Sequence, residues 1–130
     1  MYFGDFSSAA DGEDRADQGG VIDRLITDPI AAALAAKAAG DNEVARRTAR
    51  EVLRHVQKSK NHPNRPFYLT LAKAINAYCS DREDRARLLL RRIFQDQEDA
   101  KDLSVDRQNG LAQAHEELAF AVVASCQIVI

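Results

Sequence analysis

The 130-residue chain has no tryptophan and only two cysteines, three prolines and six glycines. Cys79 and Cys126 form no CxxC motif and no Cys/His ligand pair, which argues against a zinc ribbon, a thioredoxin-type site and a disulfide framework, and favours a reducing, cytoplasmic setting. The low glycine and proline content excludes a collagen-like or low-complexity chain. No apolar run reaches the roughly 18 residues of a membrane span, and no basic stretch followed by an apolar run opens the chain. We therefore expect a globular protein that makes no membrane contact.

Apolar residues recur at helical spacing along most of the chain, whose hydrophobic content of 45% and charged content of 29% are ordinary for one folded domain. The pattern predicts an all-α fold: a small helical bundle of about five helices, built from two antiparallel hairpins and a hydrophobic C-terminal helix. The expected elements are a short turn over 21–26 that stops at Pro29, an alanine-rich helix over 29–39, helices over 43–58 and 67–79, a helix that begins at a capping box of Ser80 and Glu83 and fades in 96–102, and a last helix that begins between 104 and 110.

Residues 1–20 differ in composition from the rest of the chain. Glycines and serines break any period there and acidic side chains keep the segment solvated, which predicts a flexible acidic arm in front of a single helical domain over 21–130. Tyr2, Phe3 and Phe6 nevertheless crowd the first six residues. Aromatic side chains are costly to leave in water, so we expect this tip to dock on the domain itself or on another protein.

The two expected hairpins follow one plan: a helix, a short turn with an aspartate, and a second helix. The letters LAKA at 71–74 echo LAAKA at 34–38, and a DxE triplet opens the second helix of each hairpin. This plan resembles the tetratricopeptide-type repeat unit, and the resemblance implies a protein-binding scaffold without transferring any functional residue. Two antiparallel hairpins of an ordinary helical bundle share the same pattern.

Charge is segregated along the chain, although the formal net charge is only −2. Residues 1–43 carry 3 basic and 9 acidic side chains, residues 44–92 carry 13 and 4, and residues 93–130 carry 2 and 7. The middle of the chain therefore has a charge of +9 between ends of −6 and −5. Either the acidic ends fold back over the basic middle and neutralise it, or the middle presents an exposed basic face.

The helix expected over 43–58 places its cations on one side. Four of them, at i, i+3, i+7 and i+11, form a ridge about 16 Å long that could follow several phosphates of a nucleic-acid backbone. Arginines of the next basic helix would extend this ridge if the two helices lay side by side, and an ordinary solvated face is the alternative. The candidate binding residues are Arg46, Arg47, Arg50, Arg54, Lys58, Arg87, Arg91 and Arg92.

The chain ends in an apolar segment, in which eleven of the thirteen residues from 118 to 130 are apolar. One interpretation buries the segment in the middle of the fold, and the other makes it a surface for self-association or for a partner. The candidate apolar interface residues are Phe120, Val123, Ile128 and Ile130 of this segment, together with Tyr2, Phe3 and Phe6 of the arm.

No pattern in the sequence predicts catalysis, a cofactor or a metal site. His55, His62 and His115 do not cluster, and His115 lacks the second histidine of a zinc-protease motif, so we expect it to be an ordinary surface histidine on a helix. The two cysteines fall on apolar stretches, where a thiol behaves as a small hydrophobe rather than as a nucleophile.

These observations predict a non-catalytic protein–protein interaction module, such as a small accessory subunit or an inhibitor of a larger nucleoprotein complex. We expect a protein partner, an acidic one if the arginine ridge makes the contact, and homo-oligomerisation through the C-terminal segment. The alternative is a sequence-independent nucleic-acid-binding protein that uses the arginine-rich helical face. Aromatic side chains are not interleaved with the arginines, so base stacking is not expected.

Overall fold

A computed structural model describes residues 23–102 and 106–128. Within these ranges the chain forms five helices and no strand, so the predicted all-α bundle is confirmed. The predicted acidic arm over 1–20 lies outside the described residues. The helices are α3 (Arg24–Ala38), α4 (Asn42–Lys58), α5 (Arg65–Cys79), α6 (Glu83–Asp102) and α7 (Asp106–Cys126).

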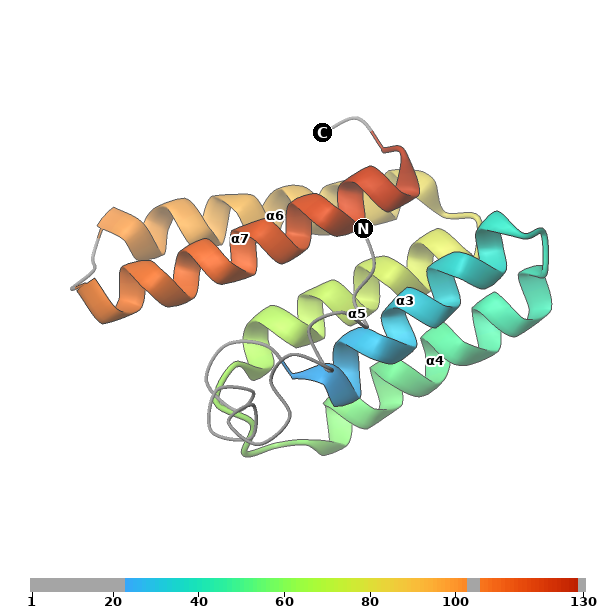
Figure 1. Cartoon of the computed structure of the whole chain (residues 1–130), viewed down its shortest axis with the longest axis horizontal. Helices are drawn as coiled ribbons and strands as arrows, with labels where there is room; N and C mark the ends of the chain where they lie inside the picture. Colours follow the sequence, from blue (N-terminus) through green and yellow to red (C-terminus); the bar gives the residue numbers. More distant parts are fainter. Residues whose placement is uncertain (1–22, 103–105, 129–130) are drawn as a thin grey trace, which may run out of the picture.

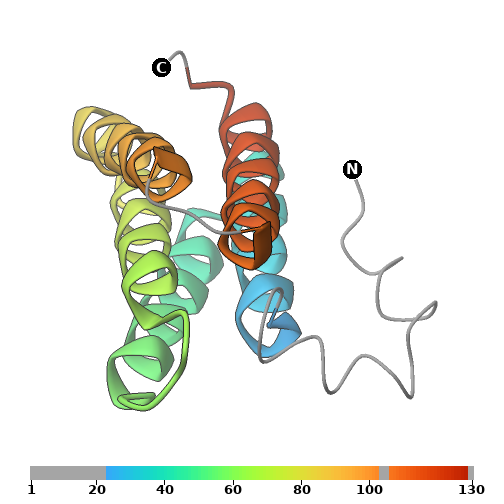
Figure 2. The same cartoon turned by 90° about the vertical axis from the view of Figure 1, so that its left-hand side faces the viewer.

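The helices pack in two layers (Figures 1 and 2). Consecutive helices run antiparallel, so α3 with α4 and α5 with α6 form the two predicted hairpins, and α7 packs back on α6. One layer holds α4, α5 and α6, with α5 in the middle, and the other holds α3 and α7. Because α5 lies between them, the basic helices α4 and α6 do not lie side by side.

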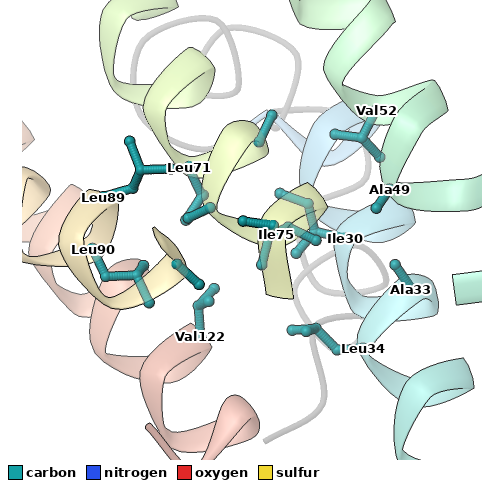
Figure 3. Packing of buried hydrophobic residues seen from close by; sticks show 14 of the residues in the cluster. Ile30, Ala33, Leu34, Ala49, Val52, Leu71, Ile75, Leu89, Leu90 and Val122 are labelled. Carbon is teal, nitrogen blue, oxygen red and sulfur yellow. The ribbon is translucent and has the colours of Figure 1, made fainter. Parts of the chain in front are cut away.

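The core lies between the layers and is centred on α5. This helix buries Tyr68, Leu71 and Ile75, each at most 1% exposed. Ile30 of α3 and Leu90 of α6 approach Ile75 from opposite sides (Figure 3). Small side chains let neighbouring helix backbones come close together. The alanines with no exposed surface include Ala33 of α3, Ala45 and Ala49 of α4, and Ala72 of α5.

Helix α3 differs from the prediction at its start. The predicted break at Pro29 is wrong, because one helix runs through Pro29 and has Asp23 as its N-cap. Pro29 removes the hydrogen bond that its N–H would give to the carbonyl of Leu25, a residue on the exposed side of the helix. The continuous helix keeps Ile26 and Ile30 on one side, where both are buried in the core. Burial of these two side chains outweighs the single lost hydrogen bond.

The same turn closes both hairpins. After α3, Gly40 has a φ of 86° and the following N–H bonds back to the carbonyl of Ala36. After α5, Asp81 has a φ of 63° and the N–H of Arg82 bonds back to the carbonyl of Ala77. This arrangement is the Schellman motif, in which one left-handed residue reverses the chain. Each second helix therefore starts within a few residues and folds back along the first.

A polar cluster fastens the start of α3 to the loop before α5. Oδ1 of Asp23 caps α3, and Oδ2 accepts a hydrogen bond from Nε2 of His62 at 2.8 Å. The N–H of Asn64 donates to Nδ1 of the same ring at 3.0 Å, which places the ring proton on Nε2. The hydroxyl of Tyr68 accepts from the backbone N–H of Asp23 at 2.9 Å, and burial raises the pKa of Tyr68 to about 12. Asp23, His62 and Tyr68 are named the polar cluster below.

Candidate functional site: a basic face across three helices

Helix α4 turns a stripe of alanines and valines to the bundle and its cations to the surface. The predicted ridge of Arg47, Arg50, Arg54 and Lys58 is exposed, and Arg46 is half-buried. Across residues 23–99 and 114–128, no ion pair involves any of these five cations. These five cations therefore have no ion-pair partner in the described part of the chain.

The cations of α4 divide between two sides of the helix. Arg46, Arg50 and Leu53 follow one another at i, i+4 and i+7, so they lie along one strip. Leu53 lines a cleft on the outer side of α5, and this strip therefore faces the cleft. Arg54 and Lys58 lie further round the helix, away from it.

The cleft has a volume of about 230 Å³ and joins the three helices of one layer. Its lining combines three cations, two neutral polar side chains and three apolar side chains, with no carboxylate. The lining residues are Leu53 of α4, Lys73, Asn76, Ala77 and Ser80 of α5 and its C-cap, and Arg82, Arg85 and Leu89 around the start of α6.

The cations of the cleft have no ion-pair partner within the described residues. Lys73, Arg82 and Arg85 are all exposed, and no ion pair in that part of the chain includes them. Three like charges at one cleft repel one another. Ala77 and Leu89 of the lining are buried, whereas its cations are exposed, so the cleft is an electropositive site with an apolar floor.

The carboxylates nearest in sequence to Arg82 and Arg85 form ion pairs with other cations. Asp81 pairs with Lys37 of α3 at 3.1 Å. Glu83 and Asp84 pair with Arg87, at 3.1 and 3.0 Å. All three acidic residues flank the start of α6 and pair with cations outside the lining of the cleft.

Helix α6 also divides its cations between two sides. Arg85, Leu89 and Arg92 follow one strip at i, i+4 and i+7, which continues from the cleft. The predicted binding residue Arg87 is half-buried in ion pairs within its own helix, and Arg91 is exposed on the side away from the cleft. The cations on the cleft side of the three helices are named the basic face: Arg46, Arg50, Lys73, Arg82, Arg85 and Arg92.

Sequence reasoning missed the contribution of α5 to this face. The prediction extended the ridge of α4 to α6 on the condition that the two helices lay side by side, but α5 lies between them and supplies Lys73, Asn76 and Ser80. These three residues stand at i, i+3 and i+7, on the side of the helix opposite most of its buried apolar residues. That polar strip is the signal that could have placed α5 on the surface between two basic helices.

The C-terminal apolar segment contributes mainly to the core. Phe120 is 57% exposed and contacts Phe94 of α6 with a ring-centroid distance of 4.6 Å, and Val123 is half-buried against the core. The remaining candidate interface residues Ile130, Tyr2, Phe3 and Phe6 lie outside the described residues. The segment's buried members are Leu118, Ala119, Val122, Cys126 and Ile128.

Ile128 was predicted to be an interface residue, but it is buried and only 5% exposed. Gln127 has a φ of 56°, and the N–H of Ile128 bonds back to the carbonyl of Val123, so a third Schellman motif ends α7. The residue after the left-handed position of this motif commonly packs back on its own helix. The turn therefore returns Ile128 to the core.

His62 and His115 both lie beside Tyr68, at ring-centroid distances of 5.2 and 6.1 Å. His115 is 5% exposed, which corrects the expectation of a surface histidine, and its ring stacks on Phe67 at 3.9 Å. Burial, with the neighbouring His62, lowers the pKa of His115 to about 4. Burial raises the pKa of Cys79, and raises that of Cys126 to about 12, so neither thiol is poised as a thiolate nucleophile.

A metal site, a membrane-spanning helix and a similarity to a known protein are three further indications of function. No group of three or more histidine, cysteine or acidic side chains in the described ranges could hold a metal ion. None of the helices there combines the length and the apolar character that crossing a membrane requires. No protein-family model, curated protein or solved structure matches this chain.

Proposed function

We propose that this protein is a non-catalytic interaction module that binds an acidic segment of a partner protein on the basic face. The observation that carries the proposal is the cleft, in which cations surround an apolar floor. Carboxylates of an acidic segment would pair with the cations, and one apolar side chain would cover Leu53 and Leu89. The resemblance of the two hairpins to tetratricopeptide-type units implies the same class of function.

The proposal also gives a reason for keeping so many like charges on one face. Their repulsion acts over a Debye length of about 8 Å at physiological ionic strength, and an acidic partner relieves it. The same charges steer an acidic partner toward the face and increase its association rate. We place this activity in the cytoplasm, where the thiols stay reduced, as that of a small accessory subunit or inhibitor of a larger complex.

The second candidate function is sequence-independent binding of nucleic acid. The exposed ridge on α4 favours it, since Arg47 and Lys58 are about 16 Å apart along the helix, several phosphate steps of duplex DNA. The apolar floor favours the acidic protein segment, because a phosphate backbone offers no apolar group that would cover Leu53 and Leu89.

Fluorescence anisotropy on the full chain separates the two functions. The probes are a labelled peptide of glutamates around a central leucine–serine pair, the same peptide with alanine for leucine, and short labelled single- and double-stranded DNA. We expect the leucine peptide to bind several-fold more tightly than the alanine peptide. DNA that binds more tightly than either peptide, and loses affinity steeply between about 50 and about 200 mM salt, would support the second function instead.

Paired variants of α4 locate the contact. Replacing both Arg46 and Arg50 by glutamine should weaken binding of the leucine peptide about tenfold, because both cations lie on the cleft side. The matched control replaces Arg54 and Lys58 by glutamine, which removes the same charge from the other side and should weaken peptide binding by no more than about twofold. Equal losses in the two variants would argue against the cleft side as the binding surface.

Self-association through the C-terminal segment is a separate proposal. Phe120 carries it, as the most exposed of the candidate apolar residues that the structure describes. Sedimentation of the full chain should show an oligomer whose fraction falls when Phe120 is replaced by serine. A monomer at all concentrations, or an oligomer that Phe120→Ser leaves unchanged, would refute this proposal.

A further inference from the structure

The cleft offers more hydrogen-bond donors than a carboxylate can use. Lys73 contributes an ammonium group, Arg82 and Arg85 contribute guanidinium groups, and Asn76 and Ser80 add an amide and a hydroxyl. A carboxylate has two oxygens and a single charge, whereas a phosphate monoester has three terminal oxygens and a charge of about −1.5 to −2 at pH 7. Three cations around one cleft therefore match a phosphate monoester better than a carboxylate.

Two of these cations stand where a helix disfavours them. Helix α6 begins at Glu83, so Arg85 lies in its first turn and Arg82 directly precedes it. The N-terminus of a helix carries a partial positive charge, which favours anions and disfavours cations. The acidic residues of the same turn offset the cations of the cleft only in part, because Glu83 and Asp84 both pair with Arg87. A bound anion would offset both the helix end and the two guanidinium groups.

The size and the apolar floor of the cleft favour a ligand that is larger than a free inorganic anion. Its volume of about 230 Å³ is more than a phosphate group alone requires. Leu53, Ala77 and Leu89 line part of it and provide a surface for carbon atoms. A phosphorylated side chain fills both parts, with its phosphate on the cations and its carbon atoms on the apolar floor.

We infer that the cleft binds the phosphate of a phosphorylated serine or threonine within the acidic segment of the partner. The inference deepens the proposed function and rests on it, because it names the chemistry that the centre of the basic face takes. Lys73, Arg82 and Arg85 donate charge-assisted hydrogen bonds to the phosphate oxygens. Arg46 and Arg92 lie on the flanking strips and meet the acidic residues on either side of the phosphorylated one.

The test compares forms of one peptide on the full chain. The leucine–serine peptide defined above is used with and without phosphate on its serine, together with an unphosphorylated peptide that carries two additional glutamates at its end and so has the same net charge. We expect the phosphorylated peptide to bind at least about tenfold more tightly than the charge-matched one. Inorganic phosphate is added as a competitor and should displace the phosphorylated peptide only at far higher concentration.

Variants of α6 assign the effect to the cleft. With Arg82 and Arg85 both replaced by glutamine, the affinity ratio of the phosphorylated to the charge-matched peptide should fall from about ten to about one. Arg91→Gln removes a cation from the same helix on the side away from the cleft, so the ratio should stay near ten. Thermal unfolding of each variant confirms that the fold is retained, and Lys73→Gln provides an independent second variant from α5.

The outcomes separate this inference from the proposed function. Equal affinity for the phosphorylated and charge-matched peptides would overturn the phosphate site while the acidic-segment function stands. Binding of the phosphorylated peptide without binding of the unphosphorylated ones would support the phosphate site and overturn the broader function. Competition by inorganic phosphate as strong as that by the phosphorylated peptide itself would show that the cleft takes a free anion, and would overturn the assignment to a phosphorylated residue.

Discussion

The two ends of α5 carry polar regions that differ in how their charges are paired. At its start, Tyr68 belongs to a cluster in which Asp23 and His62 hydrogen-bond to each other, with side chains only 16% and 11% exposed. Toward its other end, Lys73 and the neighbouring Arg85 have no ion-pair partner in the described part of the chain. The first region is complete within the chain and is interpreted as structural. The second lacks counterions and is interpreted as a binding site, so mutations in the two regions should affect different properties.

The largest effect on stability is expected in the polar cluster. Asp23→Ala removes the N-cap of α3 and the acceptor of the hydrogen bond from His62. Loss of the cap costs about 1 kcal/mol. The half-buried imidazole N–H left without its acceptor costs about 1–2 kcal/mol more. Urea denaturation should therefore show a free energy of unfolding that is lower by about 2–3 kcal/mol.

Asp41→Ala is the matched control for this variant. Asp41 caps α4 through a side-chain bond to the N–H of Val44 at 3.4 Å and is exposed. Because its side chain makes no second hydrogen bond among the described residues, its loss should cost no more than about 1 kcal/mol. Equal costs for the two aspartates would show that the hydrogen bond between Asp23 and His62 adds nothing to the cap.

The next effect is acid sensitivity at His115, which lies beside the polar cluster. The unfolded chain binds a proton at this imidazole with a pKa near 6.5, whereas burial lowers the pKa in the folded chain to about 4. The unfolded state therefore binds more protons between these values, and the stability that is fully present above pH 6.5 is lost as the pH falls toward 4. From pH 7 to pH 5 this one group should lower the free energy of unfolding by about 2 kcal/mol.

His115→Leu isolates that contribution. Leucine keeps the apolar contact with Phe67 and does not titrate, so the variant should lose about 2 kcal/mol less than the original chain between pH 7 and pH 5. Carboxylates titrate in both proteins and cancel in the difference. Parallel curves of stability against pH would contradict a buried, neutral His115.

Helix α4 shows how much of the fold the sequence alone can predict. Its apolar residues follow a strict helical period and its cap and charges agree with that period, so the prediction of 43–58 differs by one residue from Asn42–Lys58. Helix α3 could not be predicted as well, because Pro29 is a strong local signal for a break. Its cost is one hydrogen bond, and the burial of Ile26 and Ile30 that offsets it depends on contacts with other helices.

The candidate site was harder to predict than the fold, because it depends on which helices are neighbours. The sequence left open whether the ridge of α4 is exposed or covered by the acidic ends. Lys73 and Arg82 became part of the site only through the position of α5. A local motif was also misleading: Ser80 fits a capping box, but it is the C-cap of α5, and α6 begins at Glu83. Left-handed Asp81 decides this turn, and aspartate is a weaker sequence signal for that conformation than glycine.

The smallest effects on stability distinguish the two sides of α6. Arg87 makes ion pairs at i−4 and i−3, so Arg87→Gln should lower the free energy of unfolding by about 0.5 kcal/mol. Arg85 lies in the first turn of the same helix, beside Arg82 and the positive end of the helix dipole. Arg85→Gln should therefore raise the free energy of unfolding by about 0.3–0.5 kcal/mol.

High salt is the control for these two opposite changes in the free energy of unfolding. Both changes are electrostatic and lie near the surface, so near 1 M salt, where the Debye length is about 3 Å, the two variants should converge on the original chain. A loss of stability in Arg85→Gln at low salt would mean that the chain itself supplies an anion to the cleft. The cations of the basic face would then be part of the folded structure, as the side chains of the polar cluster are, and the distinction between the two ends of α5 would fail.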